Sequence, residues 1–153
     1  MDLIDTKIIN CLSENSRINA SEIAEKVKLS VSAVIERIKK LETNGTIKQY
    51  TLILNNDMIG RDVSAMISVN LDHPRFNQSF EAEVKSHAHI TECYYMAGDY
   101  DYMLKVVTHN TKSLERVLND IKSVQGVSKT RTMIVLSSVK EIFTPPLKVT
   151  KSK

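Results

Sequence analysis

The sequence contains no tryptophan and little glycine, proline or cysteine, with four, three and two of these residues among 153. The glycines are far apart, and no two have the spacing of a loop that cradles a phosphate or a dinucleotide. No apolar run approaches the ~20 residues of a membrane-spanning helix. The beginning, MDLIDTKIINCL, is acidic and amphipathic, unlike the basic and then apolar start of a signal peptide. These absences exclude the common nucleotide-binding loops and predict a cytoplasmic protein.

Patterns typical of metal sites and active sites are missing as well. Cys11 and Cys93 form no CxxC pair, and they fit small core residues in a reducing compartment better than a disulfide. His87 and His89 would point to one side of an extended segment, but no third ligand is grouped with them, and metal sites need three or four. No Ser-His-Asp or Cys-His arrangement is apparent. The sequence therefore predicts no metal, no cofactor and no enzyme.

Charge is mild overall and uneven along the chain. The net charge of +3 at pH 7 is too small to indicate a nucleic-acid partner by itself. Residues 1–60 carry eight basic and eight acidic side chains, whereas residues 28–48 carry five basic and two acidic ones. Positive charge is therefore concentrated in one short stretch of the N-terminal part.

That stretch has the pattern of two short helices joined by a three-residue bend. Asn19 with Glu22 resembles a capping box before the first helix, whose apolar face is Ile23, Ala24 and Val27. Lys28-Leu29-Ser30 interrupts the pattern, and Ser30 can cap the second helix. An apolar stripe follows, and Asn44-Gly45 ends the helix. The stripe consists of Val34, Ile35, Ile38 and Leu41.

A short bend and a second helix with small polar and basic side chains suit the major groove of DNA. We expect Arg37 to read a base edge, with Ser32, Ala33 and Glu36 on the same side of the helix. Lys39, Lys40 and Lys48 would hold phosphates. The alternative is a solvated helix face on which Arg37 pairs with Glu36 or Glu42. The predicted DNA-binding residues are Ser30, Ser32, Ala33, Glu36, Arg37, Lys39, Lys40 and Lys48.

The remaining segments complete two domains of an α+β protein. In the first, a helix over Leu3 to Leu12 precedes the two-helix unit, and a β-branched stretch from Thr46 to Leu54 predicts the strand of a wing. In the second, strands and helices alternate in the order β-α-β-β-α-β, which is the ferredoxin-like arrangement. Its strands are predicted at 62–71, 90–96, 101–107 and 127–136, and its helices begin near Phe76 and Asn110. We expect a winged helix-turn-helix domain at 1–60, a ferredoxin-like domain at 61–141 and a tail at 142–153.

Both helices of such a domain cover one face of the sheet, so the other face needs a different cover. Several strands are apolar on both sides, including the last, where Met133 and Val135 alternate with Ile134 and Leu136. An exposed apolar face of this size usually marks an interface. We therefore expect a homodimer, which would bind a palindromic operator as two-fold helix-turn-helix pairs do.

Together these features resemble the Lrp/AsnC family over nearly the whole chain. The resemblance rests on LIDTKIINCLSENSR, IAEKVKLSVSAVIERIKKLETNGTIKQY, MAGDYDYMLKV and GVSKTRTMIVLSSVK. Val31 departs from it, because the family has proline at the start of the recognition helix. The resemblance implies a cytoplasmic transcription regulator that dimerises, often assembles into octamers and binds small amino acids through its second domain.

The turn Gly98-Asp99-Tyr100-Asp101 is the predicted effector site. Its carboxylates could accept the ammonium group of an amino acid, and backbone N–H groups could bind the carboxylate. Gly-Asp also suits a hairpin turn without any ligand. A second function stays open at this point, namely an amino-acid-binding metabolic or sensor protein whose N-terminal helices mediate assembly.

Overall fold

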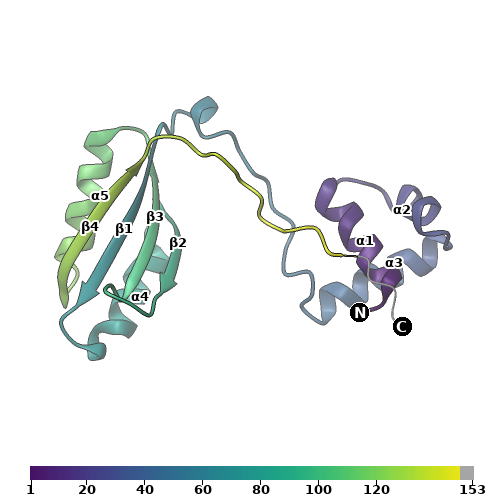
Figure 1. Ribbon diagram of the computed structural model, residues 1–153, viewed down its shortest axis with the longest axis horizontal. Coiled ribbons are helices and arrows are strands. Elements are labelled where there is room, and N and C mark those ends of the chain that lie inside the picture. The colour runs from purple at the N-terminus through teal and green to yellow at the C-terminus, as the bar shows by residue number, and fades with distance from the viewer. Residues whose placement is uncertain (149–153) are drawn as a thin grey trace. The chain divides into compact units, whose positions relative to one another are not determined.

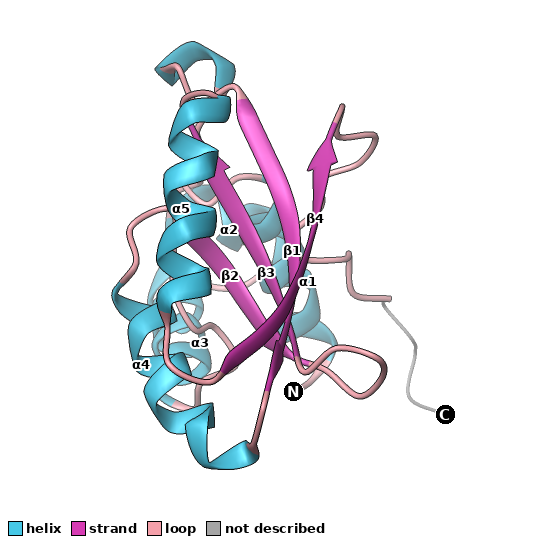
Figure 2. Ribbon diagram, turned by 90° about the vertical axis from the view of Figure 1, so that its left-hand side faces the viewer, coloured by secondary structure: helices cyan, strands magenta, loops and turns pink. Residues whose placement is uncertain are grey.

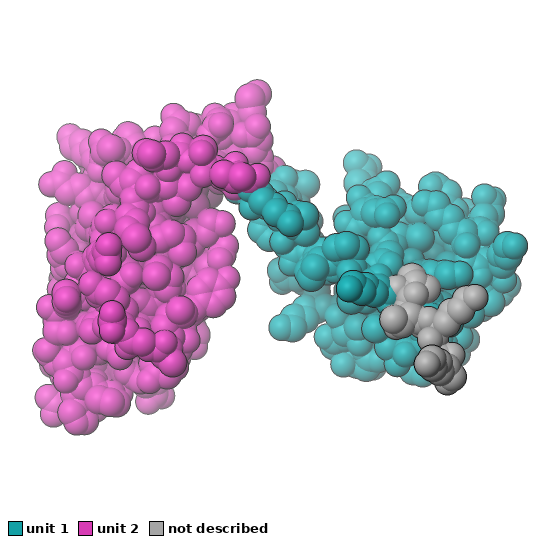
Figure 3. Space-filling view, viewed as in Figure 1, with its two compact units in different colours: residues 1–53, 140–153 teal, residues 54–139 magenta. Residues whose placement is uncertain are grey.

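The computed structural model describes residues 1–148, which form parts of two compact units (Figure 3). One unit contains residues 1–53 and the segment that begins at Lys140, and the other contains residues 54–139. This grouping differs from the expected division at residues 60 and 141, because the expected tail joins the first unit. Residues 149–153 of that tail lie outside the described residues. None of the described helices has the length and apolarity to cross a membrane.

The first unit is a three-helix bundle formed by α1 (Leu3–Glu14), α2 (Ala20–Val27) and α3 (Val31–Thr43) (Figure 1). Asn19 and Ser30 cap α2 and α3, since their side chains accept the backbone N–H groups of Glu22 and Ala33 at 2.8 and 3.3 Å. Lys28 turns the chain between these helices with a φ of 57°. The three helices share one core, in which Ile8, Ile23, Ala24, Val27 and Val34 are buried. The predicted helix-turn-helix is confirmed.

The strand predicted for Thr46–Leu54 is wrong for this chain, because residues 46–54 contain no assigned strand or helix. The first element after α3 is a 3-10 turn at Asp57–Ile59. Local β propensity needs a neighbouring strand to take up the backbone N–H and C=O groups. The apolar side chains of this segment also lack a cover, since Tyr50, Leu52 and Ile53 are all exposed, Leu52 by 80%.

The second unit is the predicted ferredoxin-like fold. Its strands are β1 (Val63–Leu71), β2 (Ile90–Tyr95), β3 (Tyr102–Thr108) and β4 (Val127–Val135), all antiparallel in the order β2-β3-β1-β4. A 3-10 turn at Pro74–Phe76 leads into α4 (Asn77–Ser86), and α5 (Thr111–Ser123) precedes β4. Both helices lie on one face of the sheet (Figure 2).

The helix-covered face of the sheet holds the core of this unit. Ala65, Ile67 and Val69 alternate along β1 and pack with Phe80 of α4 and Val117 of α5. The intervening side chains therefore face the open side of the sheet. Met66 of β1 is the cross-strand partner of Met133, and Ser68 is the partner of Met103 and Arg131. Without a covering layer in the described chain, the open face presents methionines beside charged groups.

Candidate DNA-reading helix and effector hairpin

The outward face of α3 carries the side chains that are free to contact DNA. Successive residues of an α-helix turn by about 100°, so Ser32, Glu36 and Lys39 lie opposite the buried Val34 and Leu41. Ser32, Glu36, Lys39 and Lys40 are exposed, whereas Ala33 is half-buried. Lys48 is also exposed, beyond the end of the helix.

Ile35 was expected in the core stripe, but 53% of it is exposed. Val34 and Ile35 are adjacent and point about 100° apart, so only one of them can face the centre of the bundle. Val34 is fully buried. Ile35 is therefore a residue of the outward face that sequence reasoning missed, and the helical angle between the two was the signal that could have found it.

Arg37 does not share a side with Ser32 and Glu36. Its guanidinium donates to Asp2 Oδ2 and Asp5 Oδ1 at the beginning of α1, both at 2.7 Å. The expected alternative partners, Glu36 and Glu42, are not the ones that it binds. A base contact would first have to break both ion pairs, so the structure favours a role for Arg37 in fixing α3 against α1.

The Asp2–Arg37 pairing also strengthens the beginning of α1. The Asp2 side chain accepts the backbone N–H groups of Ile4 and Asp5, and the Asp5 side chain accepts the N–H of Asp2, which completes a capping box. The N–H of Asp5 and then the Arg37 guanidinium lower the pKa of the Asp2 carboxyl. The same carboxylates raise the pKa of Arg37.

Glu42 is occupied by a different neighbour. The Tyr50 hydroxyl donates to Glu42 Oε1 at 3.0 Å and thereby ties the connecting segment to the end of α3. Burial of the hydroxyl and the adjacent carboxylate raise the pKa of Tyr50 to about 12.

The predicted effector residues form the tip between β2 and β3. Asp101 Oδ2 accepts the N–H of Leu71 at 2.8 Å, and the Asn70 side-chain amide donates to the Asp99 carbonyl at 2.9 Å. Within the described residues, no protein acceptor takes the N–H groups of residues 97–100. Hydrogen bonds to β1 therefore hold the hairpin, and the backbone N–H groups of residues 97–100 are available to a ligand.

Two residues beside the hairpin were missed by sequence reasoning. Asn70 of β1 and Lys129 of β4 are cross-strand partners. The Asn70 Oδ1 atom is buried and has no hydrogen-bond partner, and Lys129 Nζ lies 5.4 Å from the centre of the Tyr100 ring. No sequence signal joins these positions, because their adjacency depends on the order of the strands.

A shallow cavity of about 220 Å³ lies elsewhere on this unit, between α4 and the β2–β3 edge. Its charged residues are already engaged, since Glu81 accepts the Tyr102 hydroxyl at 3.1 Å and pairs with Lys85 at 3.6 Å. The cavity is lined by Glu81, Val84, Lys85, Cys93, Tyr95 and Tyr102. The hairpin offers more unused hydrogen-bonding groups than this cavity does.

The cysteines and histidines show no metal arrangement. Within residues 1–148, no three His, Cys, Asp or Glu side chains converge on a common point suited to a metal ion. Cys11 packs against the core of the helical unit, but Cys93 is exposed, so the expectation that both are core residues is wrong for Cys93.

Comparison with known proteins decides between the two functions. Residues 64–144 match the Lrp/AsnC ligand binding domain, and residues 1–42 match the AsnC-type helix-turn-helix domain. The chain belongs to the Lrp/AsnC family. It is 34% identical over 148 residues to the HTH-type transcriptional regulator FL11 of Pyrococcus furiosus, with 97% of each chain covered. It is 31% identical over 144 residues to the leucine-responsive regulatory protein of Haemophilus influenzae, with 92% of this chain and 87% of that one covered.

Solved structures give the same relationship. An L-methionine complex of a transcriptional regulator from Neisseria meningitidis has a TM-score of 0.90 and 28% identity, with 95% of this chain and 96% of that one covered. E. coli AsnC has a TM-score of 0.86 and 27% identity, with 92% and 95% covered. The Lrp/AsnC protein described here is therefore a DNA-binding transcriptional regulator with a ligand-binding unit. Its relatives are regulators, which indicates a non-enzymatic role.

Proposed function

We propose that this Lrp/AsnC regulator binds a palindromic operator as a homodimer in the cytoplasm and that a small amino acid at the hairpin modulates binding. The observation that carries the DNA-binding part is the outward face of α3, where Ser32, Ile35, Glu36 and Lys39 are all exposed. A helix with such a face can enter the major groove.

We assign the contacts of α3 by side-chain chemistry. Ser32 and Glu36 can hydrogen-bond to base edges, and Ile35 can contact a thymine methyl group. Ser30, Lys39, Lys40 and Lys48 carry hydroxyl or ammonium groups suited to phosphates, which give affinity without sequence information. Ala33 would allow close approach of the helix, and Arg37 would keep its orientation through Asp2 and Asp5.

The homodimer rests on surfaces that the single chain leaves uncovered. The open sheet face carries Met133, which is 41% exposed, and the two segments that connect the units expose Leu52, Leu54, Leu136 and Val139. A second copy would cover the sheet face and supply backbone partners to these extended segments. Further assembly of dimers, up to the octamer that the family implies, belongs to the same proposal.

The effector would be a free amino acid bound at Gly98, Asp99, Tyr100 and Asp101. Lys129 and the free N–H groups of the hairpin suit its carboxylate, while Asn70 Oδ1 and the Asp99 carboxylate suit its ammonium group. The L-methionine complex of the Neisseria regulator supports an amino acid as the class of ligand.

A mobility-shift titration with the full chain and DNA from its own promoter region tests the DNA-binding proposal. Glu36→Ala should change the preferred base at one position of each half-site, with a change in discrimination of about 1–3 kcal/mol. Lys40→Ala should weaken all sites alike and lower the slope of log K against log salt by about 0.9 per phosphate lost. Binding to the promoter that is no tighter than binding to unrelated DNA would refute the proposal.

A further inference from the structure

Two hydrogen bonds join the C-terminal segment to α1. The Asn10 side-chain amide donates to the Leu147 carbonyl, and the Leu147 N–H donates to Asn10 Oδ1, both at 3.0 Å. Asn10 thus binds both backbone polar groups of Leu147, although the two residues are 137 positions apart. Both belong to the helical unit.

The sequence around this contact favours the docked arrangement. Asparagine in a helix interior is less favourable than alanine by roughly 0.5 kcal/mol, so Asn10 lowers the intrinsic stability of α1. Pro145 and Pro146 come directly before Leu147 and limit the backbone freedom that docking has to remove. Leu147 is half-buried where it meets α1. Both partners in this contact, Asn10 in α1 and the proline-preceded Leu147, therefore favour the docked arrangement.

The C-terminal segment contributes most of the net positive charge of the helical unit. Residues 1–53 hold eight basic and seven acidic side chains, whereas residues 140–153 hold four lysines and one glutamate. The segment thus raises the net charge of the unit from +1 to +4. Residues 54–139 hold nine basic and ten acidic side chains, so no comparable excess exists in the other unit.

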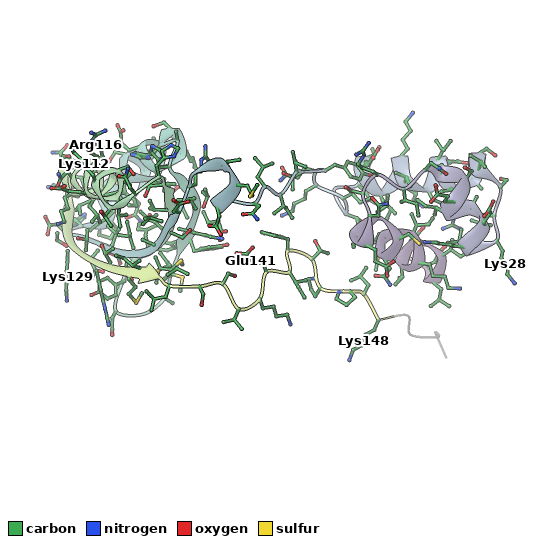
Figure 4. The ribbon with its side chains drawn as sticks, turned by 90° about the horizontal axis from the view of Figure 1, so that it is seen from above. Lys28, Lys112, Arg116, Lys129, Glu141 and Lys148 are labelled. Atoms are coloured by element: carbon green, nitrogen blue, oxygen red, sulfur yellow. The ribbon has the colours of Figure 1, made fainter. Side chains whose placement is uncertain are left out.

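We propose that the C-terminal segment is a basic arm of the DNA-binding unit, which Asn10 of α1 holds through Leu147 and which binds backbone phosphates of the operator. Lys148 directly follows Leu147, is exposed, and points away from the helices (Figure 4). Lys151 and Lys153 follow in the sequence and add two further positive charges. The inference rests on the proposed binding of operator DNA and adds a contact that lies outside the helix-turn-helix.

Phosphate contacts have a specific signature in the salt dependence of binding. Each phosphate neutralised by a lysine contributes about 0.9 to the slope of log K against log salt. Replacing Lys148, Lys151 and Lys153 by alanine in the full chain should therefore lower the slope by up to about 2.7 per bound chain. The base preference should stay unchanged, because phosphate contacts carry no sequence information.

A matched variant separates an arm from a general charge effect. Lys112→Ala, Arg116→Ala and Lys122→Ala remove the same charge from exposed positions of α5 in the other unit, two of which Figure 4 labels. This variant should keep the wild-type slope. If the slope falls equally in both triple variants, the proposed arm is wrong. The same holds if the slope does not fall in the variant that lacks the C-terminal lysines.

The role of the clamp is tested by Asn10→Ala. This substitution should lower the slope in the wild-type chain and have no further effect once the three C-terminal lysines are absent. If the losses in slope caused by Asn10→Ala and by the lysine substitutions simply add, the proposed role of Asn10 is wrong. If the full wild-type chain does not prefer its promoter, the proposed function fails. If it does prefer it and the lysine variant keeps its slope, only the arm fails.

Discussion

At the scale of single residues, Arg37 shows how a long-range contact changes the role of a side chain. On the sequence it is a basic residue of a recognition helix, which indicates a base contact. In the structure it joins α3 to the capping box of α1, 35 positions away from Asp2. No local pattern reveals this pairing, because it depends on how the bundle closes.

We expect Arg37→Met to lower the free energy of unfolding of the helical unit by about 1 kcal/mol, since two half-exposed ion pairs are lost while the stem is kept. The pKa of Asp2 is lowered from 3.8 on folding. Its stabilising contribution is therefore complete above about pH 4 and is lost as the pH falls through the folded pKa. Urea denaturation followed by circular dichroism should show a difference between the proteins at pH 7 that shrinks below pH 3.8.

Arg17→Met is the control, because it removes the same charge from the unit and Arg17 forms no ion pair within the described residues. The same variants distinguish the two roles of Arg37 on DNA. If Arg37→Met keeps its stability but loses its preference among operator variants, Arg37 reads a base after all.

At the scale of elements, the sequence was sufficient to predict helices and strands wherever local chemistry decides the structure. Alternation of apolar residues placed β1, and the caps Asn19, Ser30 and Asn110 placed α2, α3 and α5. It was insufficient where strand pairing decides, as for residues 46–54, whose β-branched residues have no neighbouring strand within residues 1–148. Of the surface proposed for the effector, the hairpin follows from local sequence, whereas Asn70 and Lys129 lie beside it only through strand order.

The hairpin surface yields a prediction for the ligand. A calorimetric screen of the common amino acids at millimolar concentration should give heat of binding with the wild-type chain. Lys129→Met should reduce that affinity by roughly 10- to 100-fold, because a charge-assisted hydrogen bond contributes about 1.5–3 kcal/mol. Lys112→Met should leave the affinity unchanged, since Lys112 lies on α5. A substitution of Asp101 would be less informative, because the Asp101 carboxylate also accepts the N–H of Leu71.

An absence of heat with every amino acid would refute the effector site. Heat that is equal in the wild type and the Lys129→Met variant would place the ligand elsewhere, and the cavity beside Glu81 and Lys85 would be the next candidate.

At the scale of the whole molecule, one chain contains each part of a regulator but leaves several surfaces uncovered. The open face of the sheet and the segments between the units expose apolar side chains. Both features are unfavourable in a monomer, because exposed apolar surface is costly and unpaired extended backbone promotes association. A single arrangement, the homodimer, would cover both and would also present two copies of α3 to a palindromic operator.

This arrangement predicts that a charge on the open sheet face will separate dimer formation from folding. Met133 is 41% exposed and lies opposite Met66, so Met133→Glu should leave the chain folded while placing a carboxylate in the dimer interface. Sedimentation should show a dimer for the wild type and a monomer for the variant. Operator affinity should fall by about 10²–10⁴-fold, because the second half-site contact loses its effective concentration. Arg116→Glu on the exposed side of α5 is the control and should remain a dimer. A wild-type chain that sediments as a monomer and still binds its operator tightly would contradict the homodimer.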